Sequence, residues 1–192
     1  IIGNQSPRYR YGVNLSARWN GIGLSVFLQG VGARDWYPGS DAGMFWGKYG
    51  RPFFALIPSI HNYTDDMYSA ERNNWDTAYW PRMTTYQSNG TKNWTRLLEI
   101  PNTRYIQSAA YLRVKNIQLD YSFPKHICSA IRLQGLKIYV NAENLFTFTP
   151  LHKYAPNFDP EGLSYDSDFA SAADGYTYPI LKSVTVGVNI TF

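Results

Sequence analysis

Apolar and polar side chains alternate without a break through Ser183-Val184-Thr185-Val186-Gly187-Val188-Asn189-Ile190-Thr191-Phe192. Successive side chains of a β-strand point to opposite faces of the sheet, so this stretch predicts a strand with one apolar face and one polar face. A strand of about 10 residues is also long enough to cross a bilayer at the usual tilt.

Four other stretches alternate in the same way, at about residues 9–19, 22–34, 111–123 and 135–149. Asn20-Gly21 separates the first two and is typical of a tight hairpin turn. In the stretch 111–123 the apolar phase changes between Val114 and Ile117, which suggests a β-bulge or the point where the strand leaves a bilayer. The pattern predicts an all-β protein with five strands, the last at about 183–192.

The connections differ greatly in length, with long irregular segments at about 36–109 and 150–182. Outer-membrane β-barrels have short turns on one side and long loops on the other, and their lowest strand number is about eight. Because an open sheet edge is not tolerated in lipid, we expect the missing strands in a longer polypeptide, and a chain beginning Ile1-Ile2-Gly3 without Met agrees with that expectation. The content of 16 Tyr, 10 Phe and 6 Trp suits a barrel, but it also suits the alternative, a secreted β-sandwich carbohydrate-binding module.

Several function classes receive no support from the sequence. The basic residues are scattered and the net charge is only +4, so we expect no nucleic-acid binding. A single cysteine, Cys128, and three widely spaced histidines predict neither a disulfide nor a metal site. No Gly-x-Ser-x-Gly motif occurs, and we expect no catalytic residues and no cofactor.

The alternating stretches also carry recognisable motifs. Val140-Asn141-Ala142-Glu143-Asn144-Leu145-Phe146-Thr147 is the most distinctive, and others are Ile2-Gly3-Asn4, Leu24-Ser25-Val26-Phe27-Leu28-Gln29-Gly30, Tyr111-Leu112-Arg113-Val114-Lys115-Asn116-Ile117, Tyr121-Ser122-Phe123-Pro124 and Val186–Phe192. Together they resemble the SusC/RagA family of TonB-dependent outer-membrane transporters, over nearly all of the chain outside the two long segments.

The resemblance implies a transmembrane antiparallel β-barrel of 22 strands in a Gram-negative outer membrane, of which residues 1–192 supply the last five strands. It implies import of oligosaccharide or peptide, with a SusD-like surface lipoprotein as lid and TonB as the energy source. The plug domain and the TonB-contacting segment lie near the N-termini of family members, outside this chain. Dimers of transporter–lid pairs are implied as well, and Phe192 resembles the aromatic end that serves as a barrel-assembly signal.

The orientation that follows makes 36–109 and 150–182 extracellular, with Asn20-Gly21 and residues 124–134 in the periplasm. Aromatic and basic side chains of the first long loop are then candidates for substrate binding, because flat rings stack on sugars or peptide side chains. The candidates are Trp46, Tyr49, Trp75, Trp80, Tyr86 and Trp94, with Arg72 and Arg82. The alternative is that these rings pack the loop against itself, its neighbours or the lid.

Overall fold

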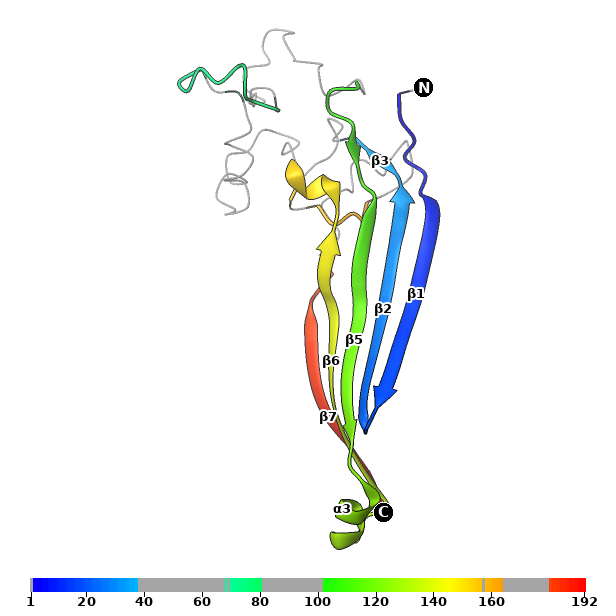
Figure 1. Ribbon diagram of the computed structural model, residues 1–192. Helices are drawn as coiled ribbons and strands as arrows, with labels where there is room; N and C mark the ends of the chain where they lie inside the picture. Colours follow the sequence, from blue (N-terminus) through cyan, green and yellow to red (C-terminus); the bar gives the residue numbers. More distant parts are fainter. Residues whose placement is uncertain (1, 38–67, 69, 81–101, 157, 164–179) are drawn as a thin grey trace. The chain divides into compact units, whose positions relative to one another are not determined.

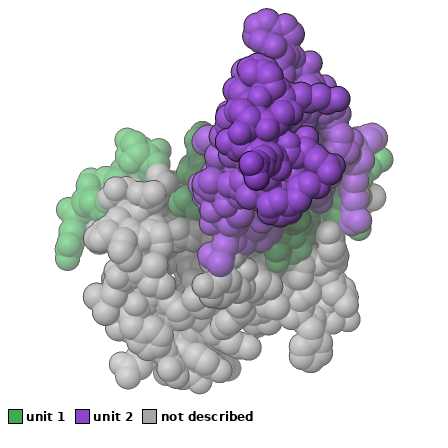
Figure 2. All heavy atoms as spheres, turned by 90° about the horizontal axis from the view of Figure 1, so that it is seen from below, with its two compact units in different colours: residues 1–8, 33–110, 149–179 green, residues 9–32, 111–148, 180–192 purple. Residues whose placement is uncertain are grey.

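The computed structural model describes residues 2–37, 68, 70–80, 102–156, 158–163 and 180–192 (Figure 1). The chain divides into two compact units, which Figure 2 shows in different colours. Unit 1 comprises Ile1–Arg8, Ala33–Ala110 and Thr149–Pro179, and unit 2 comprises Tyr9–Gly32, Tyr111–Phe148 and Ile180–Phe192. Each unit is described by itself below.

Unit 2 is built on a five-stranded sheet with the order β1-β2-β5-β6-β7. The strands are β1 (Arg8–Trp19), β2 (Ile22–Ala33), β5 (Tyr111–Ser122), β6 (Gly135–Phe148) and β7 (Ser183–Thr191), and they lie side by side in Figure 1. Their bounds lie within one residue of the ranges expected from the alternation. Strand order follows chain order, as in a meander of antiparallel strands.

The turn between β1 and β2 has the conformation that its sequence predicts. Asn20 and Gly21 both have positive φ, at 47° and 85°. A two-residue turn of this kind matches the twist of the strands that it joins, and Asn-Gly adopts it at little steric cost.

A register shift crosses the middle of the sheet at the place where the apolar phase changes. It falls between Phe27 and Leu28 in the pairing of β2 with β5, and between Val114 and Asn116 in the pairing of β5 with β6. Leu28, Val114 and Phe146 are opposite one another on one side of the shift, as are Val26, Ile117 and Ala142 on the other side. The shift therefore keeps the apolar side chains of neighbouring strands on the same face, and the bulge expected from the sequence is confirmed.

Unit 1 contains short elements that the alternation did not predict. β3 (Asp35–Trp36) and β4 (Gln107–Ser108) form a two-stranded antiparallel ribbon, and η3 (Pro150–Lys153) is a 3₁₀ helix. Thr149 caps η3, because its hydroxyl accepts a hydrogen bond from the N–H of Leu151 at 3.2 Å. In unit 2, the connection from β5 to β6 contains a further unpredicted element, the helix α3 (Lys125–Ala130).

Among the described residues, no helix combines the length and the apolar character needed to cross a membrane.

Candidate functional site

One face of the unit 2 sheet is apolar and exposed to solvent. Cross-strand neighbours on this face include Leu24 with Leu119, Val140 with Val186, and Ile138 with Val188. All six side chains are exposed, and Val186 reaches 72% exposure. Further exposed apolar side chains of the sheet are Val13, Leu15, Ile22, Val184 and Ile190. A continuous apolar surface of this kind marks contact with lipid or with another protein.

The opposite face is polar and carries an ion cluster of Arg18, Asp120 and Lys137. The Asp120 carboxylate accepts a hydrogen bond from Arg18 Nη2 at 2.9 Å, and Lys137 Nζ lies 3.3 Å from its other oxygen. The Asp120 side chain is only 7% exposed, so the two cations compensate a charge that would otherwise be costly to bury. Gly23 leaves room for this ion cluster, since a Cβ there would lie 2.7 Å from Asp120 Oδ1.

Uncharged hydrogen-bonding groups continue the polar face beside the ion cluster. Ser25, Gln118, Asn141 and Thr185 stand opposite one another in a row across four strands. Such a face suits water or a polar protein surface, whereas the other face suits hydrocarbon.

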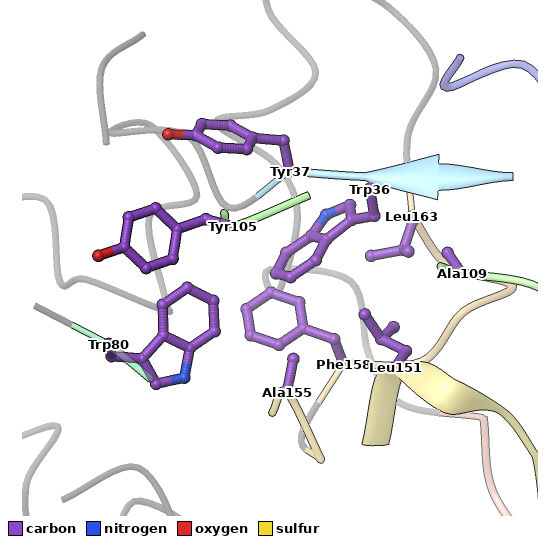
Figure 3. Packing of buried hydrophobic residues seen from close by; sticks show 9 residues of the cluster. All are labelled: Trp36, Tyr37, Trp80, Tyr105, Ala109, Leu151, Ala155, Phe158 and Leu163. Carbon is purple, nitrogen blue, oxygen red and sulfur yellow. The ribbon is translucent and has the colours of Figure 1, made fainter. Parts of the chain in front are cut away.

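Unit 1 has a hydrophobic core made largely of aromatic rings (Figure 3). The cluster consists of Trp36, Tyr37, Trp80, Tyr105, Ala109, Leu151, Ala155, Phe158 and Leu163. Trp80 stacks on Tyr105 with ring centroids 5.5 Å apart, and its Nε1 donates to the Tyr154 carbonyl at 3.2 Å. The apolar rings of the indole are therefore packed against other rings, and its polar N–H has a hydrogen-bond acceptor.

Tyr79 adds a second stacked pair at the edge of this cluster. Its ring lies on Tyr154 at 3.6 Å between centroids, and its hydroxyl donates to the Arg104 carbonyl at 2.8 Å. Burial, together with the neighbouring Tyr154, raises the pKa of Tyr79 to about 12. Burial also raises the pKa of Tyr37 to about 12, with a smaller contribution from Tyr105.

Arg34 connects three segments of unit 1 and is almost fully buried. Its guanidinium donates to the carbonyls of Gln5 (3.1 Å), Pro160 (3.0 Å) and Leu163 (2.8 Å). A planar guanidinium with several fixed donors suits this task better than a lysine would. Sequence reasoning missed this role, because the acceptors are backbone groups far away in the chain and leave no local signal.

The candidate substrate-binding residues that the structure describes differ in their exposure to solvent. Trp75 is 72% exposed and Arg72 is also exposed, whereas Trp80 is only 1% exposed, inside the aromatic cluster. The position of Trp80 agrees with the alternative in which rings pack the loop. The other candidates, Trp46, Tyr49, Tyr86, Trp94 and Arg82, lie outside the described residues.

In the part of the chain that the structure describes, no three His, Cys, Asp or Glu side chains are placed to hold a metal ion. Phe192 follows β7 and is exposed, and its role in barrel assembly stays a prediction.

Comparisons with known proteins find similar proteins among the TonB-dependent receptors. No family model matches the chain. TonB-dependent receptor P3 of Formosa agariphila is 25% identical over 198 residues, which cover 100% of this chain and 17% of the receptor. TonB-dependent receptor P39 of the same organism is 23% identical over 193 residues, with the same two coverages. TonB-dependent receptor P26 is 26% identical over 96 residues, or 48% of this chain.

Among solved structures, the RagAB peptide importer in its open-open state matches with a TM-score of 0.59 and 18% identity. Its closed-closed state matches with a TM-score of 0.58 and 18% identity. Each match covers 100% of this chain and 18% of the RagAB chain. These proteins are named as receptors and as an importer, and none of these names describes an enzyme.

The chain spans 17% of the length of the two receptors that it matches from end to end. Its exposed apolar face, its polar face and its meander order are the features expected of a section of a barrel wall. The chain is similar over its whole length to two TonB-dependent receptors, and its antiparallel sheet matches a fragment of the RagAB peptide importer.

Proposed function

We propose that this chain forms wall strands and outer loops of an outer-membrane importer. The observation that carries the proposal is the contrast between the two faces of the unit 2 sheet. One face exposes apolar side chains such as Val186 and Leu119, while the other holds the ion cluster Arg18–Asp120–Lys137. Lipid on one side and a watery or protein-filled interior on the other would satisfy both faces.

The two edges of the sheet support a barrel that continues beyond these strands. β1 and β7 are the outermost strands of the five. In hydrocarbon, every backbone N–H and C=O needs a hydrogen-bond partner. Each unpaired group at an open edge would therefore cost on the order of several kcal/mol. Further strands of a longer polypeptide would pair both edges, in a barrel of 22 strands around a plug.

The importer would take up oligosaccharide or peptide, with a SusD-like lipoprotein as lid and with energy from TonB. Residues 36–109 and 150–182 would face the outside, where the exposed side chains of Trp75 and Arg72 would contact the substrate. The similarity to a protein described as a peptide importer supports the uptake of peptides as one of the two substrate classes. Two transporter–lid pairs would associate in the membrane.

Val186→Arg tests the lipid-facing assignment in the full-length protein. An arginine on the lipid face near the midplane costs roughly 2–4 kcal/mol, so we expect less folded barrel in outer-membrane fractions. Thr185→Arg is the matched control, because Thr185 is the adjacent exposed residue of β7 and points to the polar face. Heat-modifiable migration in gel electrophoresis measures the folded amount of each variant.

Equal folded amounts of the two variants would contradict the placement of lipid at Val186. Recovery of the unmodified protein from the water-soluble fraction would contradict the membrane assignment as a whole. It would favour a secreted β-sandwich, in which a second sheet covers the apolar face.

A further inference from the structure

The connection from β5 to β6 is more ordered than a simple turn. It contains α3, and Cys128 of this helix is buried at 1% exposure. The N–H of Leu133 donates to the Cys128 carbonyl at 2.9 Å, which closes the end of the helix. The N–H of Gln134 donates to the Thr191 carbonyl at 2.8 Å, so the connection is also attached to β7. The backbone therefore holds the connection in a defined place at one end of the sheet.

This anchored connection exposes two large apolar side chains. Ile127 is 40% exposed and Ile131 is 53% exposed. Residues four positions apart lie on the same side of a helix, and Ile131 directly follows the last residue of α3 as its C-cap. The two isoleucines thus form a small apolar surface beside the buried Cys128.

The apolar face of the sheet extends to the end of β5, where the chain enters this connection. Tyr121 stands opposite Ile22 and Ile138, so it belongs to the apolar face. Its ring contacts Phe123 edge to face, with centroids 5.0 Å apart and an interplanar angle of 72°. Aromatic side chains gather where a bilayer meets water, so this pair marks the border of the apolar face.

The charge of the connection is entirely basic. Residues 123–135 contain Lys125, His126 and Arg132 and no Asp or Glu. All three basic side chains are exposed. Basic residues next to an apolar surface are typical of segments that lie on a membrane and attract its phosphate groups.

We propose that α3 and the residues that follow it dock on the membrane surface. Ile127 and Ile131 enter the boundary between headgroups and acyl chains, and Lys125 and Arg132 contact phosphate-bearing lipid headgroups. The inference rests on the proposed function, because it extends the lipid-facing surface of the sheet to this connection. The occupant is the bilayer itself, since this apolar surface follows the proposed lipid face along the chain and the flanking charges are complementary to lipid phosphate.

Depth-dependent quenching in the full-length protein tests the inference. Single cysteines replace Ile131, Ser129 or Val186 in a Cys128→Ala background without other reactive thiols, and each carries an environment-sensitive fluorophore. The proteins are placed in nanodiscs of phosphatidylcholine, with or without phosphatidylglycerol, that contain lipids spin-labelled near the headgroup or deep in the acyl chain. Ser129→Cys is the matched control, because two residues along a helix turn the side chain by about 200°.

We expect the headgroup-level quencher to quench the label at Ile131→Cys at least roughly twofold more than the label at Ser129→Cys. The reason is that only the isoleucine side of the helix enters the bilayer. Val186→Cys is expected to respond most to the deep quencher. The double variant Lys125→Gln/Arg132→Gln is expected to remove the additional quenching at residue 131 that phosphatidylglycerol produces.

A quenched label at Val186 with an unquenched label at Ile131 would overturn this inference and leave the proposed function intact. Unquenched labels at both positions would overturn the two together. A label at Ile131 that is shielded from lipid quencher and also from iodide in solution would mean that protein covers the connection, which would likewise overturn the inference.

Discussion

Glycine at position 30 allows an unusually close approach between strands of the sheet. A Cβ on Gly30 would lie 2.3 Å from the Tyr111 carbonyl oxygen and 2.5 Å from the Tyr11 hydroxyl. That hydroxyl donates to the same carbonyl at 3.1 Å, so the tyrosine ring lies across the glycine. The contact with backbone is the decisive one, because a carbonyl cannot move away as a flexible side-chain end can.

Gly30→Ala is therefore expected to destabilise the sheet by about 1–3 kcal/mol, the usual cost of forcing extra atoms into packed structure. Gly135→Ala is the control, since the nearest atom to a Cβ there is 3.6 Å away, an ordinary contact. The temperature at which the folded form is lost in heat-modifiability gels measures both variants. Equal transition temperatures would show that the close approach at Gly30 carries no constraint.

The sequence could not tell apart the tryptophans of the long loop. Trp75 and Trp80 lie in irregular chain, where no period of two or 3.6 indicates which side chains are buried. The structure places Trp80 in the aromatic cluster and Trp75 in solvent. Long-range packing against Tyr105 and Tyr154 makes this difference, and nothing local to either tryptophan encodes it.

At the scale of elements, the long strands were predictable and the short ones were not. Each of β1, β2, β5, β6 and β7 has enough alternating residues to show its own period, and the phase change near Val114 showed the bulge. β3 and β4 have two residues each, too few for a pattern. They pair through backbone groups, and the N–H of Ala109 donates to the Arg34 carbonyl at 2.8 Å directly beside the ribbon.

The aromatic cluster of unit 1 should lose stability at alkaline pH. Burial raises the pKa values of Tyr79 and Tyr37 to about 12 in the folded protein, against 10.0 for an ordinary tyrosine. The unfolded chain therefore releases these protons first, and it binds fewer protons than the folded chain between pH 10 and 12. Stability that is complete below pH 10 is then lost as the pH rises through this window.

Near-ultraviolet circular dichroism of the purified protein follows this alkaline transition. Tyr79→Phe removes one of the two titrating hydroxyls, so we expect a shallower loss of signal across the window. Tyr37→Phe should act in the same direction, and the double variant should show the smallest pH dependence. A double variant with an alkaline transition as steep as that of the unmodified protein would assign the transition to other groups.

At the scale of the whole molecule, the two units meet different physical demands. The sheet of unit 2 leaves one apolar face open, whereas unit 1 encloses a hydrophobic core of its own. Under the proposed function, the open apolar face of unit 2 contacts lipid as part of a barrel wall, whereas the enclosed core of unit 1 keeps the outer loops folded in water. The alternation could predict the apolar face of unit 2, because alternation is a local pattern. The hydrophobic core of unit 1 depends on segments far apart in the chain and leaves no such pattern.

The substitutions Trp75→Ala and Trp80→Ala separate substrate capture from folding in the full-length protein. Trp75→Ala changes an exposed side chain, so its effect on stability should be about 0.5 kcal/mol or less. Under the proposed function it should lower the uptake of labelled peptides or oligosaccharides at an unchanged folded amount. Trp80→Ala removes a buried indole, and large-to-small changes of this kind cost about 3–5 kcal/mol. Its uptake should fall only in proportion to the folded amount, as measured by heat modifiability and by transport in the same cells.

Unchanged uptake of both substrate classes by Trp75→Ala would exclude this ring as a substrate contact. Reduced uptake by Trp80→Ala at a normal folded amount would instead mean that the buried indole takes part in transport.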